Sequence, residues 1–119
     1  MFVADLHNDL VQRMIIGEDV TKKTSSGHTD VERLQLSSID LEVMIVWVSE
    51  KEPNISYFDF ASKMYDKLKA LNAINGVTVP LTLEDIKSAK ANNELSLPIG
   101  MEGGEALENK IGNLEYFIN

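Results

Sequence analysis

The sequence predicts an α/β fold built on a parallel sheet, and three observations support this prediction. Short apolar runs typical of strands alternate with stretches whose apolar residues recur at helical spacing, in the order strand, helix, strand, helix, strand, helix. The run 41–48 is apolar at every position after Glu42, as is typical of a parallel strand that is covered on both faces. The segments between the strands have lengths that suit right-handed crossover connections.

Three segments are predicted as the main strands of this sheet: 2–6, 41–48 and 95–101. Trp47, near the end of the second strand, is expected in the core between the sheet and the helices. A short β-branched stretch at 77–81 contains Pro80, which lacks a backbone N–H, so we expect an edge or connecting strand there. Three main strands are too few to close a barrel of parallel strands.

Helices are predicted between these strands from apolar spacing and from capping residues. Apolar residues recur at helical spacing over 10–16, and Gly17 is placed to end that helix. The polar segment 18–27 that follows is expected to be a loop. Thr29 and Glu32 have the spacing of a capping box and are expected to open a second short helix. Further helices are expected over 58–74, over the stretch capped by Thr82 and Asp85, and over 108–118.

Length, composition and charge limit the classes of protein to which the chain can belong. Its 119 residues suffice for one modest domain, 1–119, and 44% hydrophobic with 25% charged residues is ordinary for a globular protein. A formal net charge of −8 disfavours nucleic acid and anionic membranes as partners, because both select basic surfaces. The chain has no cysteine, which excludes disulfides, thiolate zinc sites and a cysteine nucleophile.

No targeting or membrane segment is visible in the sequence. The N-terminus lacks a basic region followed by a long apolar core, so no signal peptide is expected. The longest apolar run, 43–48, is far too short to span a bilayer. We therefore expect a cytoplasmic location.

A candidate metal site begins at the end of the first apolar run. On a regular strand, the period of two would place His7 and Asp9 on the same face, so that an imidazole nitrogen and a carboxylate oxygen converge. These are suitable ligands for a divalent cation. The alternatives are a hydrogen-bonded histidine at a strand end and an aspartate that caps the following helix.

A second acid, Glu102, follows the predicted strand 95–101 and precedes Gly103 and Gly104, which allow close approach of the backbone. Without cysteine, any metal must be held by histidine and carboxylate side chains, and the chain has two histidines, His7 and His28. We therefore predict that His7, Asp9 and Glu102 meet around a metal ion. Ligand types alone do not separate zinc from manganese or cobalt.

Several stretches resemble the membrane (renal) dipeptidase family of zinc peptidases. They are Asp-Leu-His-Asn-Asp-Leu at 5–10, His-Thr-Asp-Val-Glu-Arg-Leu at 28–34, Gly-Met-Glu-Gly-Gly-Glu-Ala-Leu at 100–107 and Gly-Asn-Leu at 112–114. The resemblance covers essentially the whole chain but only the N-terminal part of the family's domain. It implies an α/β fold that is the N-terminal part of a (β/α)8 TIM-like barrel, incomplete in this chain. Because the sequence ends within a helical pattern, we expect the complete protein to continue beyond Asn119.

The resemblance also implies a site with two zinc ions and a dipeptide as the substrate. His7 and Asp9 would bind the first zinc, and Glu102 would be the catalytic carboxylate that bridges both ions. The family's two further zinc-binding histidines, its substrate-binding arginine and a late catalytic aspartate have no counterpart here, so we expect at most one zinc in this chain. The histidine of the family that matches His28 lies in a connecting segment, so a surface or capping role is expected for His28.

Three interpretations of function follow. In the first, the chain is part of a zinc dipeptidase whose two metal ions, about 3.5 to 4 Å apart, polarise the peptide carbonyl and activate the nucleophile, and this part alone is inactive. In the second, it is a non-catalytic half-barrel that assembles with a second copy or with a missing C-terminal half. The third is another metal-dependent barrel amidohydrolase; such enzymes usually carry His-x-His where this chain has His7-x-Asp9.

Overall fold

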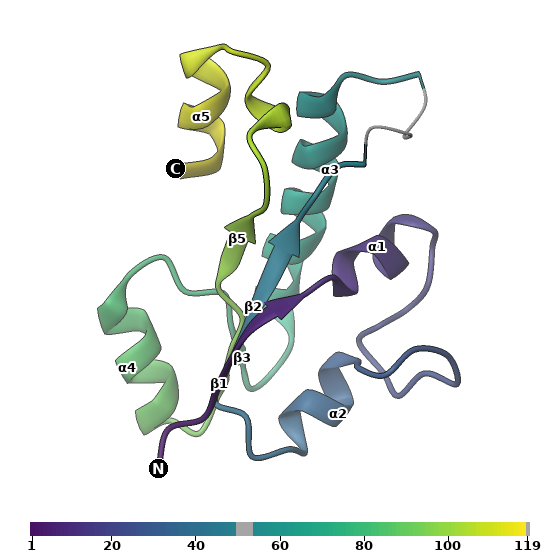
Figure 1. Cartoon of the computed structure of the whole chain (residues 1–119). Helices are drawn as coiled ribbons and strands as arrows, with labels where there is room; N and C mark the ends of the chain where they lie inside the picture. Colours follow the sequence, from purple (N-terminus) through teal and green to yellow (C-terminus); the bar gives the residue numbers. More distant parts are fainter. Residues whose placement is uncertain (50–53, 119) are drawn as a thin grey trace.

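The fold is a parallel sheet with helices packed on it, seen in a computed structural model that describes residues 1–49 and 54–118 (Figure 1). The strands are β1 (Ala4–Asn8), β2 (Leu41–Val46), β3 (Val77–Thr78), β4 (Leu95–Ser96) and β5 (Ile99–Met101). Their order is β1-β2-β4-β3, and β5 pairs with β2 as well. Each of these pairings is parallel, which confirms the α/β prediction.

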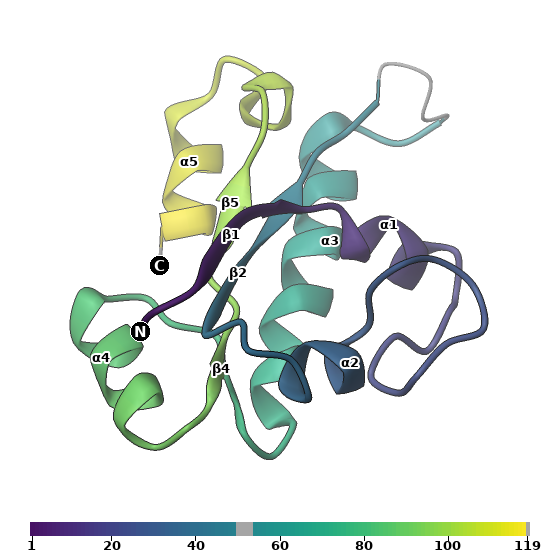
Figure 2. The ribbon, with the colours of Figure 1, turned by 60° about the horizontal axis from the view of Figure 1, so that its bottom comes forward.

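Five α-helices and two short 3₁₀ helices are described. They are α1 (Leu10–Ile15), α2 (Val31–Gln35), α3 (Tyr57–Ala70), α4 (Leu83–Ala91), α5 (Ile111–Ile118), η1 (Leu71–Ala73) and η2 (Glu105–Leu107). The first three α-helices lie on one side of the sheet and α4 lies on the other (Figures 1 and 2). This change of side follows from topology: the chain moves outward to β3 and then back to β4, and a right-handed crossover in the reverse direction requires the opposite face. Among the described helices, none combines the length and the apolar character needed to cross a membrane.

The core lies between β2 and helix α3. Met44, Val46 and Val48 alternate along the chain and are buried on the side of the sheet that faces the helices. They pack with the buried stripe of α3, which is formed by Ala61, Met64, Tyr65 and Leu68. Most of β2 is buried, as predicted for a parallel strand covered on both faces.

Trp47 does not lie in the core, and that expectation was wrong. The strand ends at Val46, and the side chain of Trp47 is 41% exposed. It falls between Val46 and Val48, so the alternation that buries its neighbours against the helices turns the indole away from them.

The third main strand that the sequence predicted is interrupted. The segment 95–101 forms two short strands, β4 and β5, separated by Leu97 and Pro98. Both pair with β2, and the carbonyl oxygen of Pro98 accepts a hydrogen bond from the backbone N–H of Met44 at 2.9 Å, so the ladder continues through the break. Helix α4 begins after Thr82, as predicted, and Thr82 and Asp85 form a capping box there. Residues 77–78 form an edge strand, one of the two roles expected for this stretch.

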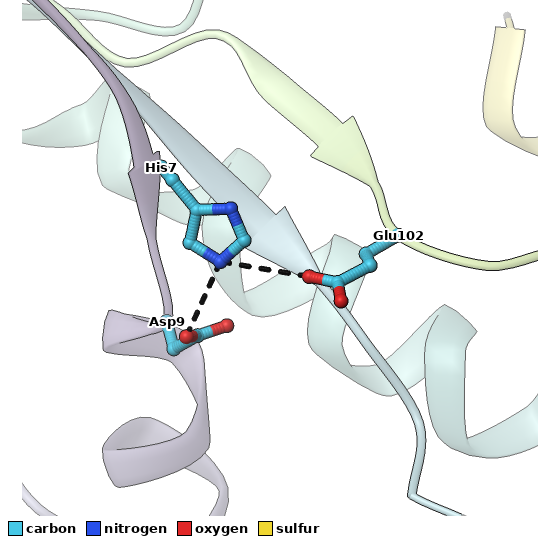
Figure 3. A group of neighbouring side chains, drawn as sticks. All are labelled: His7, Asp9 and Glu102. Atoms are coloured by element: carbon cyan, nitrogen blue, oxygen red, sulfur yellow. Dashed lines mark ion pairs between the residues drawn. The ribbon is translucent and has the colours of Figure 1, made fainter.

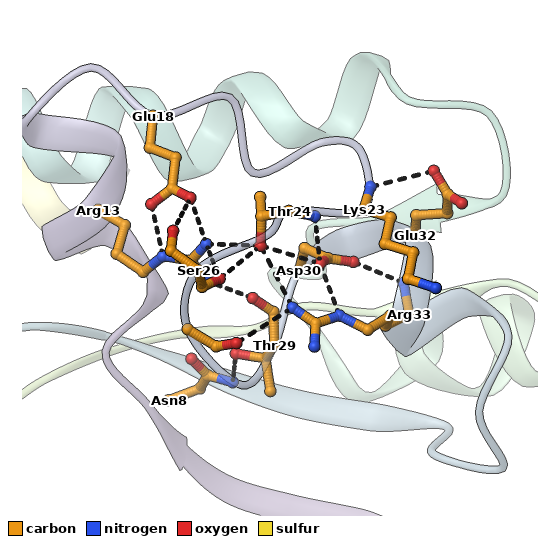
Figure 4. A network of polar contacts seen from close by, with 11 residues as sticks. Asn8, Arg13, Glu18, Lys23, Thr24, Ser26, Thr29, Asp30, Glu32 and Arg33 are labelled. Carbon is orange, nitrogen blue, oxygen red and sulfur yellow. Dashed lines mark hydrogen bonds and ion pairs between the residues drawn. The ribbon is translucent and has the colours of Figure 1, made fainter.

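The loop before α2 is held by a polar network (Figure 4). The guanidinium of Arg13 donates two hydrogen bonds to Glu18, each 2.7 Å long, and others to Thr24 and to the carbonyl oxygen of Ser26. The hydrogen bond from Arg13, together with one from Ser26, lowers the pKa of Glu18 to about 2. Residues 18–27, which the sequence indicated only as a loop, are therefore fixed to α1 by one arginine.

Asp30, and not Thr29, caps helix α2. Its carboxylate is fully buried and accepts hydrogen bonds from the backbone N–H groups of Arg33 at 2.8 Å and Thr24 at 2.9 Å. It also accepts one from the guanidinium of Arg33 at 2.7 Å. Burial pushes the pKa of Asp30 upward, but these hydrogen bonds outweigh burial and lower it to about 2.

Asp30→Ala should lower the free energy of unfolding at pH 7 by about 2 kcal/mol, because the cap is lost and buried donors are left without a partner. A carboxyl whose pKa is lower in the folded chain stabilises the fold above its ordinary pKa of 3.8, and this contribution disappears as the pH falls toward about 2. Urea unfolding at pH 7, 4 and 3 should therefore show the wild type approaching the variant as the pH falls. Lys22→Ala, at an exposed position of the neighbouring loop 18–27, is the control and should change stability little. Equal stability of Asp30→Ala and wild type at pH 7 would contradict this prediction.

Candidate metal centre

Three side chains with metal-binding groups meet at the carboxyl ends of two strands (Figure 3). His7 lies in β1, Asp9 follows β1 directly, and Glu102 follows β5. Strands β1 and β5 both pair in parallel with β2, one on each side of it, so their carboxyl ends reach the same edge of the sheet. The backbone N–H of Glu102 donates to the carbonyl oxygen of Val46 at 3.0 Å, which fixes Glu102 at the end of β2.

The distances within this cluster are short enough for one ion to be shared. The Nε2 atom of His7 lies 3.4 Å from Oδ2 of Asp9 and 3.5 Å from Oε2 of Glu102. One ligand atom from each residue can be chosen so that all lie within 4.8 Å of one another. About half of each side chain is exposed: 53% for His7, 52% for Asp9 and 52% for Glu102. The cluster is thus accessible from solvent.

A β-bulge directs His7 toward Glu102. Asp5 is in register with Glu42 and Asn8 with Met44, so Leu6 and His7 together oppose the single residue Val43. Two residues opposite one is the pattern of a bulge, which redirects side chains on the bulged strand. The expectation of a regular strand with a period of two was therefore wrong. The residues converge because the extra residue shifts the alternation, and because Asp9 has left the strand, with φ −88° and ψ 25°.

The carboxylate of Asp9 is not used to cap helix α1. Asp9 occupies the N-cap position, but its side chain accepts no capping hydrogen bond. The side-chain oxygen of Asn8 accepts instead from the backbone N–H of Leu10, at 2.9 Å. Within residues 1–49 and 54–118, His7 is the one ion-pair partner of both Asp9 and Glu102. The alternative of a capping aspartate is therefore not what the structure shows.

This donor set fits a divalent cation of the borderline or hard class. It offers one imidazole nitrogen and carboxylate oxygens from two acids, with no lysine or arginine paired to either acid among the described residues. Two carboxylates beside one imidazole form a centre whose negative charge a divalent cation would balance. The residues present therefore suit the metal site that the sequence predicts, while their role as ligands stays a prediction.

Gly103 and Gly104 follow Glu102 in the chain and differ in their backbone conformation. Gly103 has φ +77°, a left-handed conformation that favours glycine, and a Cβ there would meet the carboxylate of Glu105. Gly104 has φ −111°, and a Cβ there would meet nothing within 4 Å. The close approach that the sequence predicted thus applies to Gly103 alone.

The other candidate residues lie outside the cluster. His28 is exposed in the loop before α2, as expected. Asp5, two residues before His7 on β1, accepts a hydrogen bond from the backbone N–H of His7 at 3.2 Å but is not part of the cluster.

The sequence analysis missed the contact between Asn8 and Glu42, in which Asn8 Nδ2 donates to Glu42 Oε1 at 2.7 Å. The available signal was the one charged residue in an otherwise apolar strand.

Comparison with known proteins agrees with the family resemblance seen in the sequence. The family described as membrane dipeptidase (peptidase family M19) matches residues 1–119. The chain superposes on the crystal structure of the dipeptidase AC, a metallopeptidase of family M19, with a TM-score of 0.81 and 20% identity, covering 100% of this chain and 42% of that one. A second match is a metallopeptidase from Rhodobacter sphaeroides, liganded with a phosphinate mimic of the dipeptide L-Ala-D-Ala. Its TM-score is 0.80 and its identity 20%, over 98% of this chain and 42% of that chain. No curated protein sequence matches this chain.

The chain therefore spans less than half the length of both solved structures. At this identity, the superpositions establish the fold, which is the N-terminal part of a (β/α)8 TIM-like barrel that does not close within these residues. This confirms the fold that the resemblance implied.

Gly103→Ala should lower the free energy of unfolding by about 1–2 kcal/mol, because alanine disfavours a positive φ and its methyl group would displace Glu105. Gly104→Ala is the matched control and should stay within about 0.5 kcal/mol of the wild type. Thermal or urea unfolding of the two variants side by side measures the difference. Equal effects of the two substitutions would contradict the assignment of the backbone constraint to Gly103.

Proposed function

The chain belongs to the membrane dipeptidase family, and we propose that it supplies three ligands of a binuclear zinc centre that hydrolyses the peptide bond of a dipeptide. The observation that best supports this proposal is the convergence of His7, Asp9 and Glu102 from the ends of two strands that share β2 as a neighbour. Active groups of parallel barrels are found at this end of the strands. The His-x-Asp spacing and the family match also favour this function over a different barrel amidohydrolase.

Each of the three residues has a role in this proposal. His7 and Asp9 would hold the first zinc ion, and Glu102 would be a ligand shared by both ions. When bound, zinc would polarise the peptide carbonyl and lower the pKa of water to near neutrality. Around half of each side chain is exposed, which leaves the substrate access to the same edge of the sheet.

A dipeptide is the proposed substrate of the complete centre. The metallopeptidase from Rhodobacter sphaeroides that superposes on this chain was crystallised with a dipeptide mimic. The remaining zinc ligands, and the groups that hold the ends of the dipeptide, are proposed to come from polypeptide other than these 119 residues. The chain would then bind at most one zinc ion by itself.

Zinc titration tests the ligand set. The 119-residue chain should bind about one zinc ion, and His7→Ala and Glu102→Ala should each weaken binding more than about 10-fold, since even indirect partners of metal ligands are worth about 10–100-fold. Competition with a chromophoric chelator gives the affinities. In imidazole NMR spectra, zinc should shift the signals of His7 and leave those of His28 in place.

His28→Ala is the matched control, because it removes the chain's other histidine from an exposed loop. It should bind zinc with the affinity of the wild type. Zinc binding that survives in His7→Ala and Glu102→Ala but falls in His28→Ala would refute the proposed ligand set.

The isolated 119-residue chain, saturated with zinc, should show no appreciable hydrolysis of dipeptides. A site with three ligands for one metal ion cannot provide two-metal chemistry. An amino-acid release assay with L-Ala-D-Ala and L-Ala-L-Ala measures this. Zinc-dependent turnover that disappears in Glu102→Ala would show that the chain is catalytically complete and would contradict the prediction.

A second candidate function is non-catalytic assembly, favoured by exposed apolar side chains on β1 and α5. Leu6 on edge strand β1 is 71% exposed, and Ile111 and Ile118 of α5 are exposed as well. In this alternative, the chain pairs with a second copy or with another polypeptide that completes the sheet. Light scattering, which gives the oligomeric state, and the zinc titration together distinguish the two functions. A dimer that binds no zinc favours assembly, and a zinc-binding monomer favours the metal centre.

A further inference from the structure

We propose that Glu42 is a positioning residue, which holds the metal ligands His7 and Asp9 in place through Asn8. This inference rests on the proposed metal centre and names a residue outside the ligand set. Glu42 lies in β2, on the face of the sheet covered by the helices, whereas His7 and Glu102 converge at the sheet edge.

Glu42 is buried without the full set of partners that a carboxylate needs. Its exposed fraction is 2%, and Asp30 is the other buried acid among the described residues. Asp30 accepts several hydrogen bonds, whereas Oε2 of Glu42 has no hydrogen-bond partner within the described ranges. Burial raises the pKa of Glu42, the hydrogen bond from Asn8 opposes that rise, and nearby Asp5 adds to it. A carboxylate placed in this way costs folding free energy, so its contribution lies elsewhere.

The contact that Glu42 does make determines how the amide of Asn8 is oriented. An ionised carboxylate only accepts hydrogen bonds, so the NH₂ group of Asn8 must point toward Glu42 Oε1, at 2.7 Å. The amide oxygen is then left to accept from the backbone N–H of Leu10, at 2.9 Å. Thr29 Oγ1 accepts a longer hydrogen bond from the same NH₂ group, at 3.3 Å. Glu42 and the N–H of Leu10 thereby favour the same one of the two amide orientations.

Asn8 stands between the two ligands in the chain, at the point where the bulge ends. Leu6 and His7 oppose one residue of β2, and Asn8 returns to register with Met44. The hydrogen bond to Glu42 holds Asn8 on the helix side of the sheet, and the hydrogen bond from Leu10 fixes the start of α1. His7 is thereby kept directed at Glu102, and Asp9 is kept free of capping. Loss of Glu42 should let the bulge relax and separate the ligand atoms.

The test compares two substitutions at Glu42. Glu42→Leu replaces the carboxylate with an apolar side chain of similar size and so removes the hydrogen-bond acceptor. Glu42→Gln keeps an acceptor oxygen but removes the charge. Zinc affinity of the 119-residue chain, measured by chelator competition, should fall about 10–100-fold in Glu42→Leu and by less in Glu42→Gln. The melting temperature of Glu42→Leu should equal or exceed that of the wild type, because a buried charge is removed. A purely structural residue would show the opposite combination, with lower stability and unchanged affinity.

Four further variants complete the series. Asn8→Ala should weaken zinc binding as Glu42→Leu does. A double variant with both substitutions should bind zinc with about the affinity of the weaker-binding single variant, because both substitutions break the same contact. Asp30→Asn, at the other buried acid, should lower the melting temperature and leave zinc affinity within about twofold. His7→Ala in the same series reports on the metal centre itself.

The outcomes distinguish the proposed positioning role of Glu42 from the proposed metal centre. If His7→Ala loses zinc and Glu42→Leu binds it as the wild type does, the positioning role is overturned and the metal centre stands. If His7→Ala keeps the affinity of the wild type, or the wild type binds no zinc, both are overturned. Loss of affinity in Glu42→Leu at unchanged or higher melting temperature, with partial recovery in Glu42→Gln, supports the positioning role.

Discussion

Parallel pairing of β2 with β1 on one side and β5 on the other is the constraint on which the candidate site depends. The two outer strands are separated by most of the chain, yet their carboxyl ends meet because each follows the ladder of β2. Helix α3 and the apolar residues of β2 bury the central strand, and this burial holds the two neighbours in register. His7 and Glu102 are thus brought within 3.5 Å by the sheet and need no loop to close over them.

Two buried carboxylates show how the chain uses polar groups for different purposes. Asp30 is surrounded by donors from Thr24 and Arg33, and its pKa is lowered to about 2, so its charge stabilises the fold. Glu42 keeps one oxygen without a partner and its pKa is raised, so its charge opposes the fold. The two carboxylates are similarly buried but have opposite effects on stability. We infer that Asp30 stabilises the fold, whereas Glu42 positions residues of the neighbouring strand β1.

The sequence predicted the parts of the fold that depend on pattern. The unbroken apolar run of β2 indicated a parallel sheet, and the placement of His7, Asp9 and Glu102 after apolar runs indicated one shared edge. The bulge in β1 was missed because it depends on the register with β2, which apolar periodicity does not encode. The cap of α2 was misplaced by one residue because Asp30 and Thr29 are both good capping residues, and tertiary contacts to Arg33 and Thr24 selected Asp30.

Binding a metal and hydrolysing a dipeptide place different demands on the chain. The positions of His7, Asp9 and Glu102 are set by pairings and a bulge that lie entirely within residues 1–102, so the proposed ligand set does not depend on a closed barrel. Hydrolysis requires a second ion and groups that orient the substrate, and the chain spans 42% of the solved dipeptidase structures that it matches. We therefore expect metal binding without hydrolysis in this chain, because the proposed metal ligands are already in place within these residues.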